Sequence, residues 1–192
     1  MDKEYMKKLI LTGLLVVSMN TQANEDINYS YLEVGYGYLD YAKNLTPDGF
    51  YLEGAFDVSE HFYIGGHVDK RNSGNSDFNR YDLSLGFHTN GSSNTDFYTE
   101  FRVGYLDFGR IDGSTMALFA GTRTAFNEKF ELITKIGVTN LDDIDQPEGN
   151  NIMVYEADVK GVFKFTKKQA FTASVESYDG KFGAKIGYRY SF

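Results

Sequence analysis

The 192-residue chain has no cysteine and no tryptophan, and it has only two prolines. Without cysteine there are no disulfides, no thiolate chemistry and no lipidated N-terminal cysteine. Positive charge is also scarce, because 19 lysines and arginines stand against 27 acidic residues and give a formal net charge of -8. This acidic balance argues against nucleic acid as a partner.

Long hydrophobic runs are absent after the first 23 residues. The one such run, Leu9–Met19, follows Lys7 and Lys8 and precedes a plausible cleavage point after Ala23. It is too short for a membrane-spanning helix, which needs about 20 apolar residues. We therefore expect residues 1–23 to be a cleaved signal peptide and residues 24–192 to form one domain. A buried N-terminal helix is the alternative. Export without cysteines is typical of a bacterial envelope protein.

Apolar and polar residues alternate with a period of two along nearly all of the remaining chain, which predicts β-strands. Ten segments share this alternation: 28–40, 49–58, 61–71, 78–89, 96–108, 114–126, 129–139, 152–165, 169–178 and 181–192. Their length is close to the roughly 9–11 residues that a tilted strand needs to cross a membrane. Longer connections, "RIDGS" among them, roughly alternate with short ones, as in outer-membrane barrels. Two connections break this rule: "TNGSSNTD" is too long for a tight turn, and "SYDGK" predicts a tight last hairpin.

The fold class that this pattern predicts is all-β: a closed antiparallel up-and-down transmembrane β-barrel of ten strands, with eight strands as the alternative. A sheet in lipid must close on itself because every backbone donor and acceptor needs a partner. A soluble barrel or sandwich is also compatible with alternation. In each strand, every second residue faces the same side of the sheet, and we call the set that contains the polar residues the polar parity. Aromatic residues near the strand ends and glycines on the polar parity favour the membrane barrel.

Charged residues of both signs occupy the polar parity, which faces the interior of a membrane barrel. The predicted lumen cluster comprises Glu33, Glu53, His67, Asp69, Arg80, Asp82, Glu100, Arg102, Arg123, Lys135, Lys185 and Arg189. A ten-stranded barrel is only modestly wider than one that side chains fill. We expect these charges to pair across a plugged or very narrow lumen and to have a structural role.

The same parity contains one candidate for catalysis. His67 can act as a general base whose imidazole is oriented by the carboxylate of Asp69. Asp82 lies on the next strand, also on the polar parity. No motif supplies a nucleophile beside them. We therefore expect no catalytic residues, no cofactor and no metal site, and a lipid-modifying or proteolytic enzyme is the outside alternative.

The chain ends on aromatic residues at alternating positions, Tyr188, Tyr190 and Phe192. This ending resembles the β-signal of Gram-negative outer-membrane proteins, and the whole chain resembles small outer-membrane β-barrels of the porin-like and OmpA/OmpX-like type. The resemblance implies location in the outer membrane, contact with its lipid and lipopolysaccharide, and recognition by the barrel-assembly machinery. We expect a monomer with a structural or porin-like envelope role. A narrow channel for small solutes and adhesion or binding through the loops remain alternatives.

Overall fold

The computed structural model describes residues 27–40, 46–74, 77–108, 111–143 and 151–192, and the expected signal peptide, residues 1–23, lies outside them. Ten antiparallel strands form a single sheet: β1 (Tyr31–Asp40), β2 (Asp48–Asp57), β3 (Phe62–Asn72), β4 (Asp77–Ser92), β5 (Thr95–Phe108), β6 (Ile111–Asn127), β7 (Phe130–Asp143), β8 (Asn151–Lys164), β9 (Gln169–Tyr178) and β10 (Lys181–Ser191). The described residues include no helix that is long and apolar enough to cross a bilayer.

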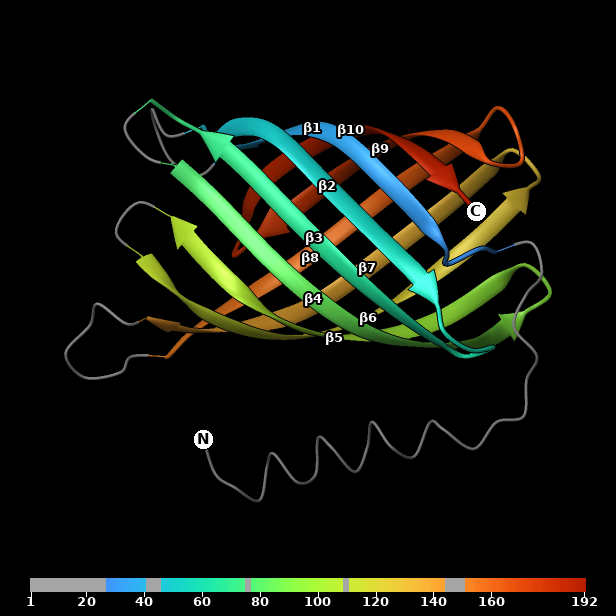
Figure 1. Ribbon diagram of the computed structural model, residues 1–192, viewed down its shortest axis with the longest axis horizontal. Helices are drawn as coiled ribbons and strands as arrows, with labels where there is room; N and C mark the ends of the chain where they lie inside the picture. The colour runs from blue at the N-terminus through green and yellow to red at the C-terminus, as the bar shows by residue number, and fades with distance from the viewer. Residues whose placement is uncertain (1–26, 41–45, 75–76, 109–110, 144–150) are drawn as a thin grey trace, which may run out of the picture.

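The sheet closes on itself, so every strand pairs with two neighbours (Figure 1). Closure is made by β1 and β10, which pair over the full length of β1, from Tyr31 opposite Ser191 to Asp40 opposite Phe182. The predicted all-β antiparallel barrel of ten strands is confirmed, and the eight-strand alternative is wrong. Residues 28–30 were part of the first predicted segment but lie outside the ladder, because β1 starts at Tyr31.

The connections fall at two ends of the barrel. The turns 58–61, 93–94, 128–129 and 165–168 lie at the same end as the start of β1 and the C-terminus (Figure 1), and we call this the turn end. At the opposite end, which we call the loop end, β1, β3, β5, β7 and β9 end and the strands that follow them begin. In outer-membrane barrels the short turns face the periplasm.

Two predicted connections are wrong in length. The stretch "TNGSSNTD" is mostly strand, because β4 and β5 continue pairing through a register shift between Asn90 and Ser92. The stretch "RIDGS" likewise continues into β6, which starts at Ile111. In both places a longer ladder satisfies backbone groups that a loop would leave to water. The tight last hairpin is as expected, with Asp179 and Gly180 at φ values of 48° and 76° that suit a two-residue turn.

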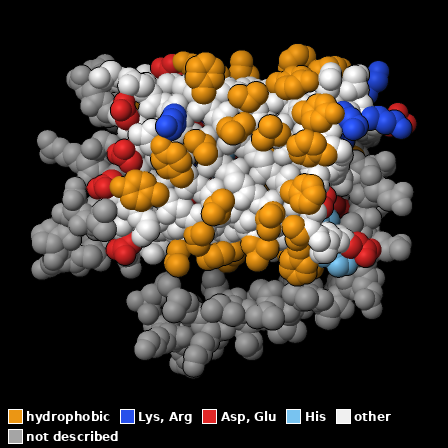
Figure 2. Space-filling view, viewed as in Figure 1, with side chains coloured by type: hydrophobic (Ala, Val, Ile, Leu, Met, Phe, Trp, Pro, Cys, Tyr) orange, Lys and Arg blue, Asp and Glu red, His pale blue; other side chains and the backbone are white. Residues whose placement is uncertain are grey.

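The two faces of the sheet invert the arrangement of a soluble protein. On β9, Phe171 and Val175 are 60% and 56% exposed on the outer face, whereas Thr172 and Glu176 are 5% and 3% exposed on the inner face. Hydrophobic side chains cover the visible barrel wall, and the charged side chains lie mostly toward its two ends (Figure 2). An apolar belt with polar ends is the surface that a bilayer requires.

Small apolar clusters narrow the interior near both ends. At the turn end Ile27 and Tyr29, which precede β1, pack against Tyr63, Tyr98 and Ala125. At the loop end Leu39 and Phe78 pack with Leu106 and Tyr178. The charged part of the lumen lies between these two clusters.

Candidate functional site: the charged lumen

The inner parity of the strands brings the predicted lumen residues together inside the barrel. Eight of the ten strands contribute to the predicted set of twelve, which lies on β1 to β7 and β10. Nine of the twelve are buried, and Glu53, Arg102 and Lys135 are half-buried. Because a closed barrel faces its inner residues toward one another, strands distant in sequence form shared ion pairs. Among the described residues, the pairs that involve lysine or arginine fall into four groups, each named here after one member.

The Glu33 cluster consists of Glu33, Glu53, Lys160 and Arg189. Glu33 has no exposed surface. It accepts hydrogen bonds from Arg189 Nε at 2.8 Å, Lys160 Nζ at 3.1 Å and the Tyr51 hydroxyl at 2.8 Å. Lys160 also donates to Glu53 at 3.1 Å. Two carboxylates and two cations therefore balance across the barrel, between β1, β2, β8 and β10.

The Glu176 cluster consists of Asp69, Arg71, Glu176 and Lys185. Arg71 binds Asp69 through two nitrogens, at 2.9 and 2.7 Å, and donates to Glu176 at 2.6 Å. Lys185 lies 3.3 Å from Asp69 and 2.8 Å from Glu176. This cluster is also balanced. Bidentate arginine–carboxylate pairs of this kind hold both side chains in one geometry.

The Arg80 cluster consists of Arg80, Asp82, Glu100, Arg102 and Glu156. Arg80 donates to Asp82 at 2.7 Å and to Glu156 at 3.0 and 3.1 Å. Arg102 donates to Glu100 at 2.5 Å and lies 3.7 Å from Asp82. Three carboxylates thus face two arginines in this cluster.

The Glu131 triad lies near the turn end and consists of Arg123, Glu131 and Lys164. Glu131, 1% exposed, lies 2.6 Å from Arg123 and 3.3 Å from Lys164. The Arg123 guanidinium also stacks on the Tyr29 ring, 4.3 Å from its centre. Burial raises the pKa of the Tyr29 phenol well above its ordinary value of 10.0, so this residue stays neutral.

Little free volume remains between the two ends of the lumen. Three interior cavities of about 30, 50 and 20 Å³ lie among the charged side chains, and all three are lined by Glu53 and Arg102. Lys135 lines two of these cavities and lies 5.1 Å from the centre of the Phe119 ring. Each cavity has room for only one or a few waters. A much larger cavity, of about 860 Å³, opens at the turn end.

The candidate for a catalytic base, His67, is 7% exposed. Its Nε2 lies 3.6 Å from Asp69 and its Nδ1 lies 3.6 Å from Glu53. Both carboxylates are already bound to cations, Asp69 to Arg71 and Glu53 to Lys160. Within the described part of the chain, no group of three or more His, Asp or Glu side chains is arranged to hold a metal ion.

Some lumen residues are missing from the predicted set although the same signal includes them. Arg71 shares the parity of His67 and Asp69, and Lys160, Glu131 and Glu176 lie on the inner parities of β8, β7 and β9. Tyr29 also shares the inner parity of Glu33, but its contacts with Tyr63 and His88 could not be predicted, because this residue precedes the ladder. Alternation says nothing about the path of a segment outside the ladder.

The closed sheet, the apolar outer belt and the ion-paired interior define a small outer-membrane β-barrel. This is the fold that the resemblance to small outer-membrane β-barrels implies. Among solved structures, an outer membrane channel from Pseudomonas putida F1 is similar at a TM-score of 0.55 and 9% identity, over 90% of this chain and 98% of that one. The NanC porin has a TM-score of 0.49 and 10% identity, over 84% of this chain and 100% of that one. The KdgM porin has a TM-score of 0.47 and 10% identity, over 84% of this chain and 99% of that one.

At these identities the similarity establishes the fold alone. No protein-family model and no curated protein sequence matches the chain. The activity therefore has to be argued from the lumen itself.

Proposed function

We propose that this protein is a non-catalytic outer-membrane barrel whose lumen is closed, with a structural role in the envelope. The observation that supports this proposal is the filling of the lumen. The three interior cavities described above, between the apolar clusters at the two ends, hold only about 20 to 50 Å³ each. Opening a continuous path for solutes would require separating buried ion pairs, and removing one partner of such a pair costs about 3–5 kcal/mol.

Conductance in planar bilayers tests the closed lumen. The refolded barrel is inserted into the bilayer, and insertion is verified separately by protease protection and a heat-modifiable band on gels. We expect no discrete current steps from inserted protein. Reproducible steps whose number follows the amount of inserted barrel would overturn the proposal.

The runner-up is a narrow channel for water and small ions. It is favoured by the three small cavities that share Glu53 and Arg102 and extend along the lumen. Small, cation- or anion-selective current steps would support this function. Uncharged sugars need a wider path than either function provides. We therefore expect no uptake of such sugars in a liposome-swelling assay.

The absence of catalysis is supported by the surroundings of His67, whose two neighbouring carboxylates are engaged in ion pairs with Arg71 and Lys160. Mass spectra of lipid A from cells with and without the protein test this point. We expect identical spectra. A modified lipid A that disappears in the His67→Ala variant would establish an enzyme instead.

The route to the membrane is part of the same proposal. Residues 1–23 act as a signal peptide, and the exposed aromatic side chains of Tyr188, Tyr190 and Phe192 at the end of β10 are read by the barrel-assembly machinery. N-terminal sequencing of the protein from outer membranes should begin at Asn24. A start within residues 1–23 would contradict the cleavage.

A further inference from the structure

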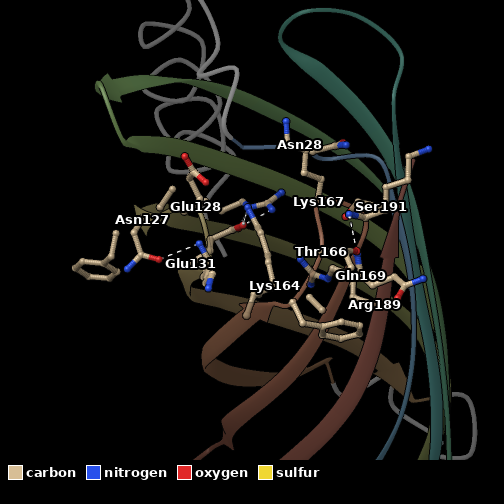
Figure 3. A pocket seen from close by; sticks show the side chains of 18 of the residues that line it. Asn28, Asn127, Glu128, Glu131, Lys164, Thr166, Lys167, Gln169, Arg189 and Ser191 are labelled. Carbon is tan, nitrogen blue, oxygen red and sulfur yellow. Dashed lines mark hydrogen bonds and ion pairs between the residues drawn. The ribbon is translucent and has the colours of Figure 1, made fainter.

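The cavity of about 860 Å³ at the turn end differs in charge from the rest of the molecule. It is bounded by the β6–β7 and β8–β9 turns, the last residues of β10 and Asn28 (Figure 3). Six lysines and arginines and two glutamates line it, although the protein as a whole has a net charge of -8. We call this cavity the vestibule.

The base of the vestibule is built around one carboxylate of the cavity lining. Glu131 lies between two cations, 2.6 Å from Arg123 and 3.3 Å from Lys164. Asp96, which faces Arg123 in the β5–β6 ladder, is fully buried and is not one of the lining residues. The surface that the described lining residues present to the cavity is therefore mainly cationic.

The two guanidinium groups at the base are fixed in place before any ligand arrives. Arg123 stacks on Tyr29 and binds Glu131, whereas Arg189 stacks 3.8 Å from the centre of the Tyr31 ring and binds Glu33. Fixed donors lose little conformational entropy when a ligand binds. Arginine in such a fixed geometry suits carboxylate and phosphate groups.

The rim adds exposed cations above this base. Lys129 and Lys167 are exposed in the β6–β7 and β8–β9 turns, and Glu128 is the one acidic residue of the vestibule lining beside them. Figure 3 shows Glu131 and Lys164 side by side, with Gln169 and Arg189 across the cavity. Lys168 is directed elsewhere, toward the ring of Tyr190 at 5.9 Å.

We propose that the vestibule is a binding site for a small multivalent anion that carries phosphate or carboxylate groups. The volume lies within the roughly 300–1,000 Å³ typical of small-molecule sites. Because the short turns face the periplasm, the ligand is a periplasmic solute. The site lies outside the closed part of the lumen, so binding does not depend on whether the barrel conducts.

Isothermal titration calorimetry of the refolded barrel in zwitterionic micelles at low ionic strength tests the site. Pyrophosphate and citrate serve as probes and distinguish phosphate from carboxylate ligands, and sucrose serves as the neutral solute. We expect saturable binding of at least one anion, weakened by added salt, and no binding of sucrose. Absence of saturable binding for both anions at millimolar concentration would overturn the proposal.

Three variants locate the binding. Lys164→Gln with Lys167→Gln should weaken binding about tenfold or more, because it removes charge-assisted contacts. Glu128→Gln should strengthen it about twofold, because it removes an exposed like charge. The matched control is Lys70→Gln with Lys181→Gln, which changes the net charge equally at the loop end.

The control variant should bind as the unmodified protein does. An equal loss in the control would show that the anions respond to overall charge, and the proposed site would then be wrong. The heat-modifiable band verifies that each variant folds. A conducting barrel that still binds pyrophosphate in the vestibule would refute the closed lumen while leaving this inference standing.

Discussion

The carboxylate of Glu33 is expected to contribute more to stability than an exposed carboxylate, and Glu33→Gln measures that contribution. Glu33 is fully buried and accepts hydrogen bonds from Arg189, Lys160 and Tyr51. The variant keeps the size of the side chain but leaves Arg189 without its carboxylate. Breaking a buried pair costs about 3–5 kcal/mol. Lys160 retains Glu53 at 3.1 Å, so we expect about 3 kcal/mol.

Urea-dependent unfolding in micelles, followed by far-ultraviolet circular dichroism, gives the free energy of unfolding for a chain without tryptophan. Exposed Glu128→Gln is the control and should change this energy by less than about 0.5 kcal/mol. Glu33→Gln combined with Arg189→Gln should destabilise less than the sum of the two single variants, by about 0.5–3 kcal/mol. A folded Glu33→Gln barrel that loses under about 1 kcal/mol, with additive double-variant energies, would refute the stabilising role of the buried ion pairs.

Three further perturbations have distinct expected results. Tyr29→Phe should leave stability at neutral pH unchanged or slightly higher, since the Tyr29 hydroxyl makes no hydrogen bond within the described residues. Because the pKa of Tyr29 is raised in the folded state, an unfolded chain loses that proton first above about pH 10, so Tyr29→Phe should also reduce the loss of stability at alkaline pH. Gly86→Ala should destabilise by about 1–3 kcal/mol, because a Cβ at this position overlaps the ring of Tyr63. Phe192→Ala should lower the amount of folded barrel in the outer membrane of cells while changing stability in micelles by under about 1 kcal/mol, because its side chain is 59% exposed.

Each of these has a matched control in the chain. Tyr63→Phe should cost about 1.5–3 kcal/mol, since its hydroxyl donates to Glu100 at 2.9 Å. Gly66→Ala should be tolerated, because the nearest atom to its Cβ is 3.6 Å away. Phe182→Ala removes an equally exposed ring from the other end of β10. Equal membrane yields for Phe192→Ala and Phe182→Ala would contradict a C-terminal assembly signal.

Much of the architecture follows from local pattern. Alternation with a period of two is a backbone property of strands, so the bounds of β9, residues 169–178, are identical in prediction and structure. The same property placed residues such as Glu33 and Asp69 on one face. The pattern failed to predict the strand residues at Asn90–Ser92 and after Ile111. The sequence around these positions is rich in polar residues and glycine, as in a loop, although the backbone continues to pair.

What the sequence by itself determined was the period of two, the apolar parity that faces lipid and the charged parity that faces inward. Only the tertiary structure decided which charges meet, because closure brings Lys160 of β8 to Glu33 of β1 and Arg71 of β3 to Glu176 of β9. Residues more than 100 positions apart have no local signal for their contact. The cationic vestibule arises for the same reason, since only the closed barrel brings Arg189 of β10 to the same cavity as Arg123 of β6.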